Sequence, residues 1–222
     1  MKSLGCVMPT YNQAEFIAEA VASVQGQVDR LVIVDDGSAD GSLGGLAGTL
    51  RSDACVLRNE ENLGTAKAIN RGASQLPEQW LTWVSSDNVH TENWASALLS
   101  VAAEGVGAVY SAFWYERGGL RPQRHFTPYG PDRLIGTLNC FFGPSFIIRR
   151  DVWQKHRGRI SHDYDNWLRV EEACWSKGLE IVALDEPLCH YRAHDKRVTI
   201  TRRHEFDAGR WQAEARERRA SA

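Results

Sequence analysis

The sequence predicts an α/β fold: one domain with a mainly parallel central sheet and helices on both faces, followed by a C-terminal helical extension. Apolar, β-favouring runs alternate with segments of helical periodicity through the first half of the chain, as in a parallel sheet whose crossovers are helices. The runs are continuous in apolar character, which is typical of strands buried on both faces. We expect a domain over residues 1–195, divided into halves 1–110 and 111–195, and the extension over 196–222.

Strands and helices alternate in the first half. A strand is expected at 4–8, ended by Pro9, because proline lacks the N–H that a ladder needs. The helix that follows carries one apolar face, and the segment 43–50 is at best a weak helix. That face contains Phe16, Ile17, Ala20, Val21 and Val24. The further expected strands are 31–34, 55–57, 80–84 and 108–114, and the further helices are 65–75 and one marked by Trp94, Ala97, Leu98 and Val101.

The second half is less regular. Residues 115–145 are rich in Gly, Pro, Arg and aromatic residues and are expected to be loops with one short helix near Pro131–Leu138. A strand is expected at 145–149 and a helix at 163–177, which Gly178 ends. Two short strands at 180–183 and 188–192 precede a charged helix from Thr201 onward.

Composition narrows the class of protein. The chain has 222 residues, 43% of them apolar and 24% charged, with a net charge of −2, so it has no basic field for nucleic acid. No run approaches the roughly 20 apolar residues of a membrane span, and the N-terminal apolar run is too short for a signal peptide. Five scattered cysteines without a C-x-x-C pair favour a reduced, cytoplasmic protein in which they are small core residues.

Polar residues follow three of the expected strands, at Pro9–Asn12, Asp35–Ser38 and Ser85–His90. The carboxyl ends of parallel strands meet at one edge of a sheet, so these clusters should converge there. An aromatic ring, carboxylates and hydroxyls suit a nucleotide, and without a glycine-rich phosphate loop a divalent cation would balance the phosphates. Each cluster could instead be only a turn or helix cap, Tyr11 a core aromatic residue, and His90 a surface histidine.

Seven segments, in this order and spacing, resemble a family 2 glycosyltransferase of the GT-A (Rossmann-like) fold. The resemblance covers about residues 4–195. The segments are VMPTYN at 7–12, LVIVDDGSADGS at 31–42, NLGTAKAINRG at 62–72, WVSSDN at 83–88, FGPSFIIRRDV at 142–152, HDYDNWLRV at 162–170 and EPLCHYRAH at 186–194.

The resemblance implies an inverting transfer of a sugar from a nucleotide-diphosphate sugar, with a UDP-sugar as the expected donor and Mn²⁺ or Mg²⁺ as the cofactor. It implies Asp163 as the catalytic base, because an acceptor hydroxyl needs a carboxylate to take its proton. It makes Asp87 and His194 the metal ligands, with serines at the two positions before Asp87. The implied nucleotide-sugar residues are Pro9 and Tyr11 at the base, Asp36 as acceptor of a base N–H, Lys67, Ser86 and Asp87.

The acceptor and the catalytic competence stay open at this point. The aromatic and basic stretch 113–142 is compatible with an acceptor that carries an anionic group, and equally with a solvated hairpin. A sugar nucleotidyltransferase is disfavoured because it needs a glycine-rich basic loop after the first strand. A degenerate protein that binds nucleotide sugar without catalysis is the other alternative, motivated by Ser85 and Ser86. An oligomer is compatible with the sequence.

Overall fold

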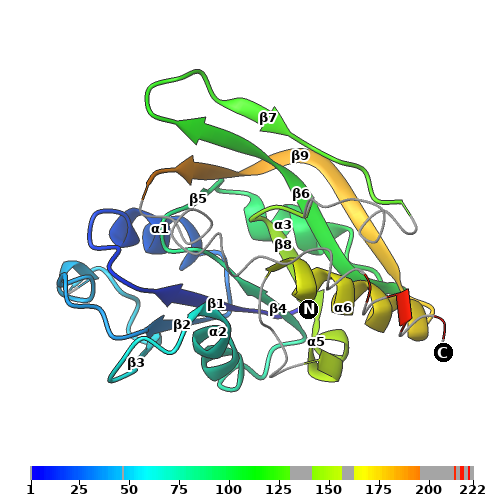
Figure 1. Cartoon of the computed structure of the whole chain (residues 1–222), viewed down its shortest axis with the longest axis horizontal. Coiled ribbons are helices and arrows are strands. Elements are labelled where there is room, and N and C mark those ends of the chain that lie inside the picture. The colour runs from blue at the N-terminus through cyan, green and yellow to red at the C-terminus, as the bar shows by residue number, and fades with distance from the viewer. Residues whose placement is uncertain are drawn as a thin grey trace.

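A computed structural model of the chain describes residues 2–46, 48–130, 142–156 and 163–195, with isolated positions nearer the C-terminus and without the side chains of 155–156 and 163–166. One nine-stranded sheet runs through it in the order β3-β2-β1-β4-β8-β6-β9-β5, and β7 pairs with β6 (Figure 1). The strands are β1 (Leu4–Thr10), β2 (Arg30–Asp35), β3 (Cys55–Arg58), β4 (Trp80–Trp83), β5 (Val89–His90), β6 (Val106–Arg117), β7 (Gln123–His125), β8 (Phe146–Arg149) and β9 (Glu180–Ala193).

The predicted α/β fold is confirmed, and the sheet is parallel where the sequence pattern is clearest. Strands β3, β2, β1 and β4 pair in parallel, and so do β6 and β9. Strand β8 is antiparallel to both of its neighbours, and β5 and β7 are also antiparallel to their partners. The second half of the sheet is therefore mixed.

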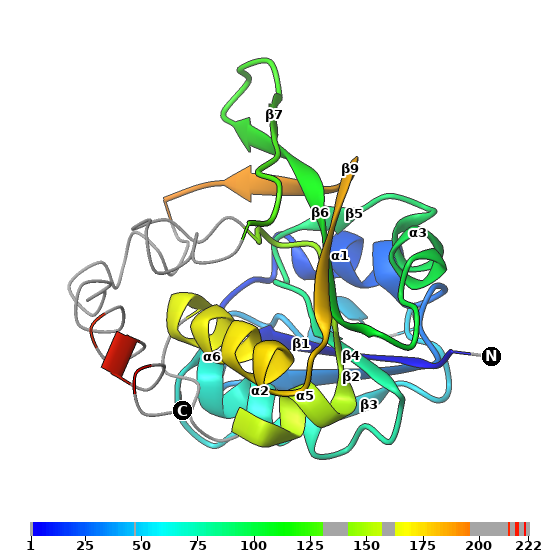
Figure 2. The ribbon, with the colours of Figure 1, turned by 90° about the vertical axis from the view of Figure 1, so that its right-hand side faces the viewer.

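Helices cover both faces of the sheet, as predicted (Figure 2). On one side α1 (Ile17–Val24) and α3 (Trp94–Ser100) pack over a core cluster that includes Met8 and Ile33. On the other side α2 (Thr65–Ala73), α5 (Arg150–His156) and α6 (Asp163–Ser176) pack over a cluster that includes Val7 and Val34. Successive strand residues thus enter opposite cores, which is why β1 and β2 are apolar without alternation. The weak helix expected at 43–50 is a 3₁₀ turn at Gly44–Leu46.

Four local expectations were wrong. Strand β1 continues through Pro9, which lies opposite Val34 and is followed by Thr10. The two short strands expected at 180–183 and 188–192 are one strand, β9, because irregular pairing with β6 between Ser111 and Ala112 absorbs the residues between them. Strands β5 and β7 had no expected counterpart, since short strands formed by distant pairing leave little local signal.

Several expectations fall outside the described residues. The short helix near Pro131–Leu138 is one, and apart from isolated positions the C-terminal extension over 196–222 is another. The division of the domain into 1–110 and 111–195 stays a prediction. Cys6, Cys174 and Cys189 are buried free thiols, as expected, whereas Cys55 is half-buried. No helix within the described ranges is long and apolar enough to cross a membrane.

The expectation that His90 lies at the surface was also wrong. His90 is only 4% exposed, pairs with Cys189 across β5 and β9, and packs against Trp94 with ring centroids 4.5 Å apart and an interplanar angle of 53°. Its Nε2 lies 3.5 Å from the carbonyl oxygen of Pro144. Burial lowers the pKa of His90 from 6.5 to about 4, because the protonated ring loses its hydration.

This burial makes stability depend on pH. Between pH 6.5 and about 4 the unfolded chain binds a proton at His90 that the folded chain does not, so the free energy of unfolding falls as the pH drops through that window. Across this pH window, protonation of His90 lowers the free energy of unfolding by about 3 kcal/mol. Urea unfolding of wild type and His90→Phe at pH 7.5 and 4.5 should show the smaller acid loss in the variant. Equal losses in both proteins would contradict the buried, neutral state of His90.

Candidate functional site

The polar segments after β1, β2 and β4 converge at one edge of the sheet, as the strand order requires. The Asp36 backbone N–H donates to the carbonyl oxygen of Thr10 at 2.8 Å, which joins the ends of β1 and β2. The Val84 N–H donates to the carbonyl oxygen of Val7 at 2.9 Å, which places the segment after β4 beside β1. Three loops separated in sequence therefore form one surface.

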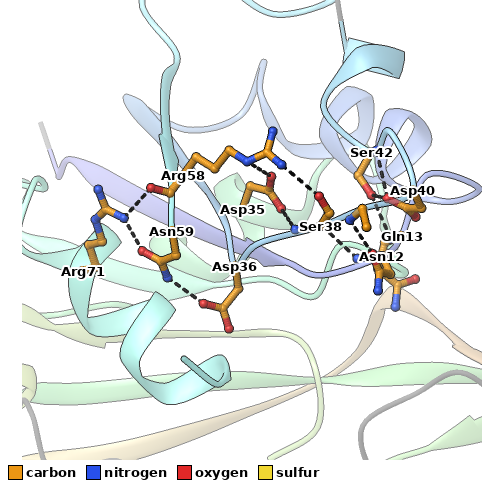
Figure 3. Close-up of polar contacts among 11 residues, drawn as sticks. Asn12, Gln13, Asp35, Asp36, Ser38, Asp40, Ser42, Arg58, Asn59 and Arg71 are labelled. Carbon is orange, nitrogen blue, oxygen red and sulfur yellow. Dashed lines mark hydrogen bonds and ion pairs between the residues drawn. The ribbon is translucent and has the colours of Figure 1, made fainter. Parts of the chain in front are cut away.

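The loop after β1 is held by side chains of the loop after β2 (Figure 3). The Asn12 N–H donates to Ser38 Oγ at 2.9 Å, and Asn12 Oδ1 accepts the Ala39 N–H at 2.9 Å. The Gln13 N–H donates to Ser42 Oγ at 3.0 Å. Asn12 has a φ of 53°, a left-handed conformation that asparagine tolerates better than most residues. These bonds fix the backbone on which Tyr11 stands.

Asp36 has a structural role that the sequence analysis did not anticipate. Its carboxylate accepts a hydrogen bond from Asn59 Nδ2 at 2.6 Å, as Figure 3 shows, and further bonds from the Leu63 N–H at 3.0 Å and the Gly64 N–H at 2.8 Å. Asp36 is 3% exposed and so ties the end of β2 to the segment that leads into α2. A carboxylate has about four acceptor positions, so one remains for a ligand N–H.

Gly37 allows this loop to close. Its φ is 81°, and a Cβ at this position would lie 2.9 Å from the carbonyl carbon of Glu61. Any larger residue would clash with backbone as well as adopt a disfavoured conformation. The D-D-G-S sequence is thus explained locally by the side-chain hydrogen bonds of Asp36 and Ser38 to neighbouring backbone and by the close approach at Gly37.

Asp87 and His194 come together although they are 107 positions apart. His194 Nε2 lies 3.0 Å from Asp87 Oδ2, and the two side chains are 17% and 16% exposed. Asp87 Oδ1 and His194 Nδ1 are both buried and have no hydrogen-bond partner among the described residues. Buried polar atoms without a partner are rare and costly in folded proteins, so this pair calls for a ligand.

The donor set fits a divalent cation supported by other ligands. A carboxylate oxygen and an imidazole nitrogen are both common ligands of divalent metal cations. No group of three or more His, Cys, Asp or Glu side chains gathers as a metal site within the described ranges. The protein therefore offers two ligands here, and the remaining coordination positions would be left to a phosphate-bearing ligand and water.

The other predicted site residues lie along the same edge, with different exposure. Tyr11 is 44% exposed, so the alternative that it is a core aromatic residue was wrong. Pro9 is half-buried near the end of β1. Lys67 is exposed in the first turn of α2, which follows the Leu63–Gly64 segment that binds Asp36. Ser86 is buried.

Asp163 is the first residue of α6, and its side chain lies outside the described part of the chain. Helix α6 is held against the sheet through Trp167, whose ring stacks on Phe142 at a centroid distance of 3.9 Å and meets Phe146 edge-on at 4.7 Å. Trp167, one turn after Asp163, thus anchors the first part of this helix to the core.

Two residues at the site were missed as site residues. Arg192 Nε donates to the carbonyl oxygen of Asp87 at 2.5 Å, and its Nη1 pairs with Glu19. Phe16 was assigned to the apolar face of the helix, but it precedes α1 and its ring stacks on His194. The local signal for this group is the R-A-H sequence, in which Arg192 lies near the end of β9 and His194 follows directly after the strand.

Comparison with known proteins identifies the family. The sequence profile of glycosyl transferase family 2 matches residues 6–157. The chain belongs to glycosyltransferase family 2. A glycosyltransferase of Haemophilus influenzae whose function is uncharacterised is 22% identical over 217 residues, covering 89% of this chain and 71% of that protein.

Solved structures confirm the predicted GT-A fold of this family 2 glycosyltransferase. Staphylococcus aureus TarS in complex with UDP-GlcNAc superposes with a TM-score of 0.67 and 18% identity, over 89% of this chain and 60% of that chain. The mannosyltransferase PcManGT of Pyrobaculum calidifontis, in complex with GDP-Man and Mn²⁺, gives a TM-score of 0.66 and 18% identity, over 91% and 60%. The chain thus spans about 60% of the length of both solved chains, of which the TarS chain is residues 1–349 of that protein.

The structural role of Asp36 gives a stability prediction. Asp36→Asn puts an amide in place of an oxygen that accepts buried donors, so the free energy of unfolding should fall by about 1–3 kcal/mol. Asp53→Asn is the control: Asp53 is 58% exposed, and its one ion pair among the described residues is with Arg51. The loss of unfolding free energy in Asp53→Asn should be much smaller, as is usual for exposed ion pairs. If urea unfolding gives equal losses of unfolding free energy for the two variants, the hydrogen bonds of Asp36 contribute no more to stability than an exposed ion pair does.

Proposed function

We propose that this family 2 glycosyltransferase moves a sugar from a nucleotide-diphosphate sugar to an acceptor hydroxyl with inversion at the sugar carbon, assisted by a divalent cation. The observation that carries the proposal is the Asp87–His194 pair at the edge where β1, β2 and β4 end. Each residue buries one ligating atom without a partner among the described residues. The facing atoms Asp87 Oδ2 and His194 Nε2, 3.0 Å apart, would hold a cation that is shared with a diphosphate.

A UDP-sugar is the proposed donor and Mn²⁺ the proposed cation. The fold neighbours TarS and PcManGT are described in complex with UDP-GlcNAc and with GDP-Man and Mn²⁺, respectively. An imidazole ligand favours Mn²⁺ over Mg²⁺, which prefers oxygen. Bound between Asp87, His194 and the diphosphate, such a cation supplies charge neutralisation for the departing diphosphate.

The nucleotide is proposed to lie on the loops that follow β1 and β2. The exposed ring of Tyr11, on a backbone fixed through Asn12, offers a face for the base, with Pro9 beside it. The remaining acceptor position of Asp36 suits a base N–H. Lys67 on α2 and Ser86 beside Asp87 complete the proposed donor contacts.

Asp163 is proposed as the general base at the start of α6. It takes the proton of the acceptor hydroxyl while the hydroxyl oxygen attacks the sugar carbon and the bond from that carbon to the diphosphate oxygen breaks. One in-line displacement of this kind inverts the configuration. The acceptor is an unidentified hydroxyl compound. The exposed Arg117 and Arg121 are available to bind an anionic group on the acceptor, whereas Arg124 is already paired with Asp185.

A binding protein without catalysis is the second candidate. It is favoured by the two serines before Asp87, which leave the described site with two protein ligands for a cation. Donor turnover separates the two functions: an enzyme releases UDP continuously, whereas a binding protein retains the intact donor.

The cation and the nucleotide should bind cooperatively. Two protein ligands hold Mn²⁺ weakly, and a diphosphate adds oxygen ligands, so Mn²⁺ should bind more tightly when UDP is present. Asp87→Asn should weaken Mn²⁺ binding in the UDP complex by more than the roughly 10–100-fold that the loss of an outer-shell partner costs. Electron paramagnetic resonance of free Mn²⁺ during titration measures both effects.

Glu186→Gln provides the matched control, because Glu186 is exposed and bonds only Asn93 among the described contacts. It should titrate like wild type. Equal Mn²⁺ affinity with and without UDP, or wild-type affinity in Asp87→Asn, would contradict the proposed site.

Asp163→Asn should abolish transfer while sparing donor affinity. The amide keeps the size of the side chain but accepts no proton, and removal of a positioned base typically costs about 10²–10⁴-fold in rate. Asp165 lies ~200° further round the helix and should not face the same acceptor, so Asp165→Asn is the matched control with a milder effect. The measurements are UDP release in the presence of an acceptor pool and UDP affinity by calorimetry. A dead Asp165→Asn beside an active Asp163→Asn would move the base to Asp165.

A further inference from the structure

The ring of Phe16 lies against two functional side chains at the end of β9. It stacks on the imidazole of His194 with ring centroids 4.6 Å apart and an interplanar angle of 27°. The guanidinium carbon of Arg192 lies 5.2 Å from the centroid of the same ring. Phe16 directly precedes α1 and is half-buried, although a phenylalanine in a helical apolar face would ordinarily enter the core.

These contacts connect three distant segments. Arg192 donates from Nε to the carbonyl oxygen of Asp87 and from Nη1 to Glu19 of α1. Its backbone N–H donates to Asn88 Oδ1 at 3.2 Å. The end of β9 is thereby attached both to the segment after β4 and to α1, and Figure 1 shows the end of β9 on the side of the molecule where α1 lies. The ring of Phe16 packs against the side chains of Arg192 and His194.

The imidazole of His194 needs such support. Its one hydrogen-bond partner among the described residues is Asp87, which Nε2 meets at 3.0 Å, and its Nδ1 has none. A ring held by a single contact keeps its rotation about the Cβ–Cγ bond, and a ligand ring is normally fixed by a second partner. A flat aromatic surface parallel to the imidazole restricts the same rotation by packing.

We propose that Phe16 is a positioning residue for His194: its ring fixes the plane of the imidazole so that a ring nitrogen and an oxygen of Asp87 meet the same cation. This inference rests on the proposed function, because the cation belongs to that function. Phe16 touches neither the cation nor the donor in this assignment. It acts through His194, and Arg192 holds the Asp87 backbone in register with it.

The assignment predicts which property of Phe16 matters. Phe16→Tyr keeps the flat face and should leave Mn²⁺ affinity in the UDP complex unchanged. Phe16→Leu keeps an apolar side chain but removes the ring, and it should weaken Mn²⁺ affinity by about 10–100-fold, the range typical of residues that orient a ligand. Phe126→Leu is the control, since Phe126 is also half-buried and beside an arginine, Arg124, but lies on the β7 side of the sheet.

The experiment is a titration of Mn²⁺ followed by electron paramagnetic resonance, on the full chain with saturating UDP, with thermal unfolding recorded for each variant. The expected result is a loss in Phe16→Leu alone, in a variant that still unfolds cooperatively. Wild-type affinity in Phe16→Leu, or an equal loss in Phe16→Tyr or Phe126→Leu, would overturn the positioning role. If wild type itself binds no Mn²⁺ with UDP, the proposed function fails, and the inference that rests on it fails too.

Discussion

The parallel pairing of β9 with β6 is the constraint on which the site depends. Strand β9 begins beside the core and ends beside α1, and its last residues carry Arg192 and His194 to Asp87. Without that long ladder Asp87 would have no histidine side chain beside it. Because β6 and β9 are both long and pair over most of their length, a small shift in register would move Arg192 and His194 to the other face of the sheet. The position of His194 is thus fixed by a backbone ladder that ends at Ala193, directly before it.

A second group of interactions shapes the donor side of the same edge. The polar residues after β2 mostly bind protein backbone: Ser38 and Ser42 hold the loop after β1, and Asp36 holds the segment before α2. This arrangement leaves exposed side chains such as Tyr11 on a rigid base. A preorganised loop loses little conformational entropy when a ligand binds, which favours affinity without additional contacts.

Local sequence patterns predicted much of the fold because each core is filled by nearby elements. The continuous apolar runs of β1 and β2 follow directly from two buried faces, and the polar strand ends follow from the parallel order. What the patterns could not predict depends on distant pairing. His90 has a polar side chain but is buried because β5 pairs with β9. Pro187 does not end β9 because the pairing register with β6 shifts next to it.

The same reasoning applies to the site. Asp87 and His194 were predicted from a resemblance and meet in the structure, but the role of Phe16 was hidden because its spacing fits a helical apolar face equally well. Asp36 shows the opposite case, since a residue expected at the ligand also carries three protein hydrogen bonds. Sequence alone does not distinguish a carboxylate that binds a ligand from one that binds protein donors, because either kind follows a strand.

The central claim is that Asp87 and His194 share one cation with the donor diphosphate. Anomalous diffraction at the manganese edge, from crystals grown with UDP and MnCl₂, tests it most directly. The account predicts a single strong peak in contact with Asp87, His194 and the diphosphate oxygens. Ordered UDP with no manganese peak between these two residues, or a peak at other side chains, would contradict it.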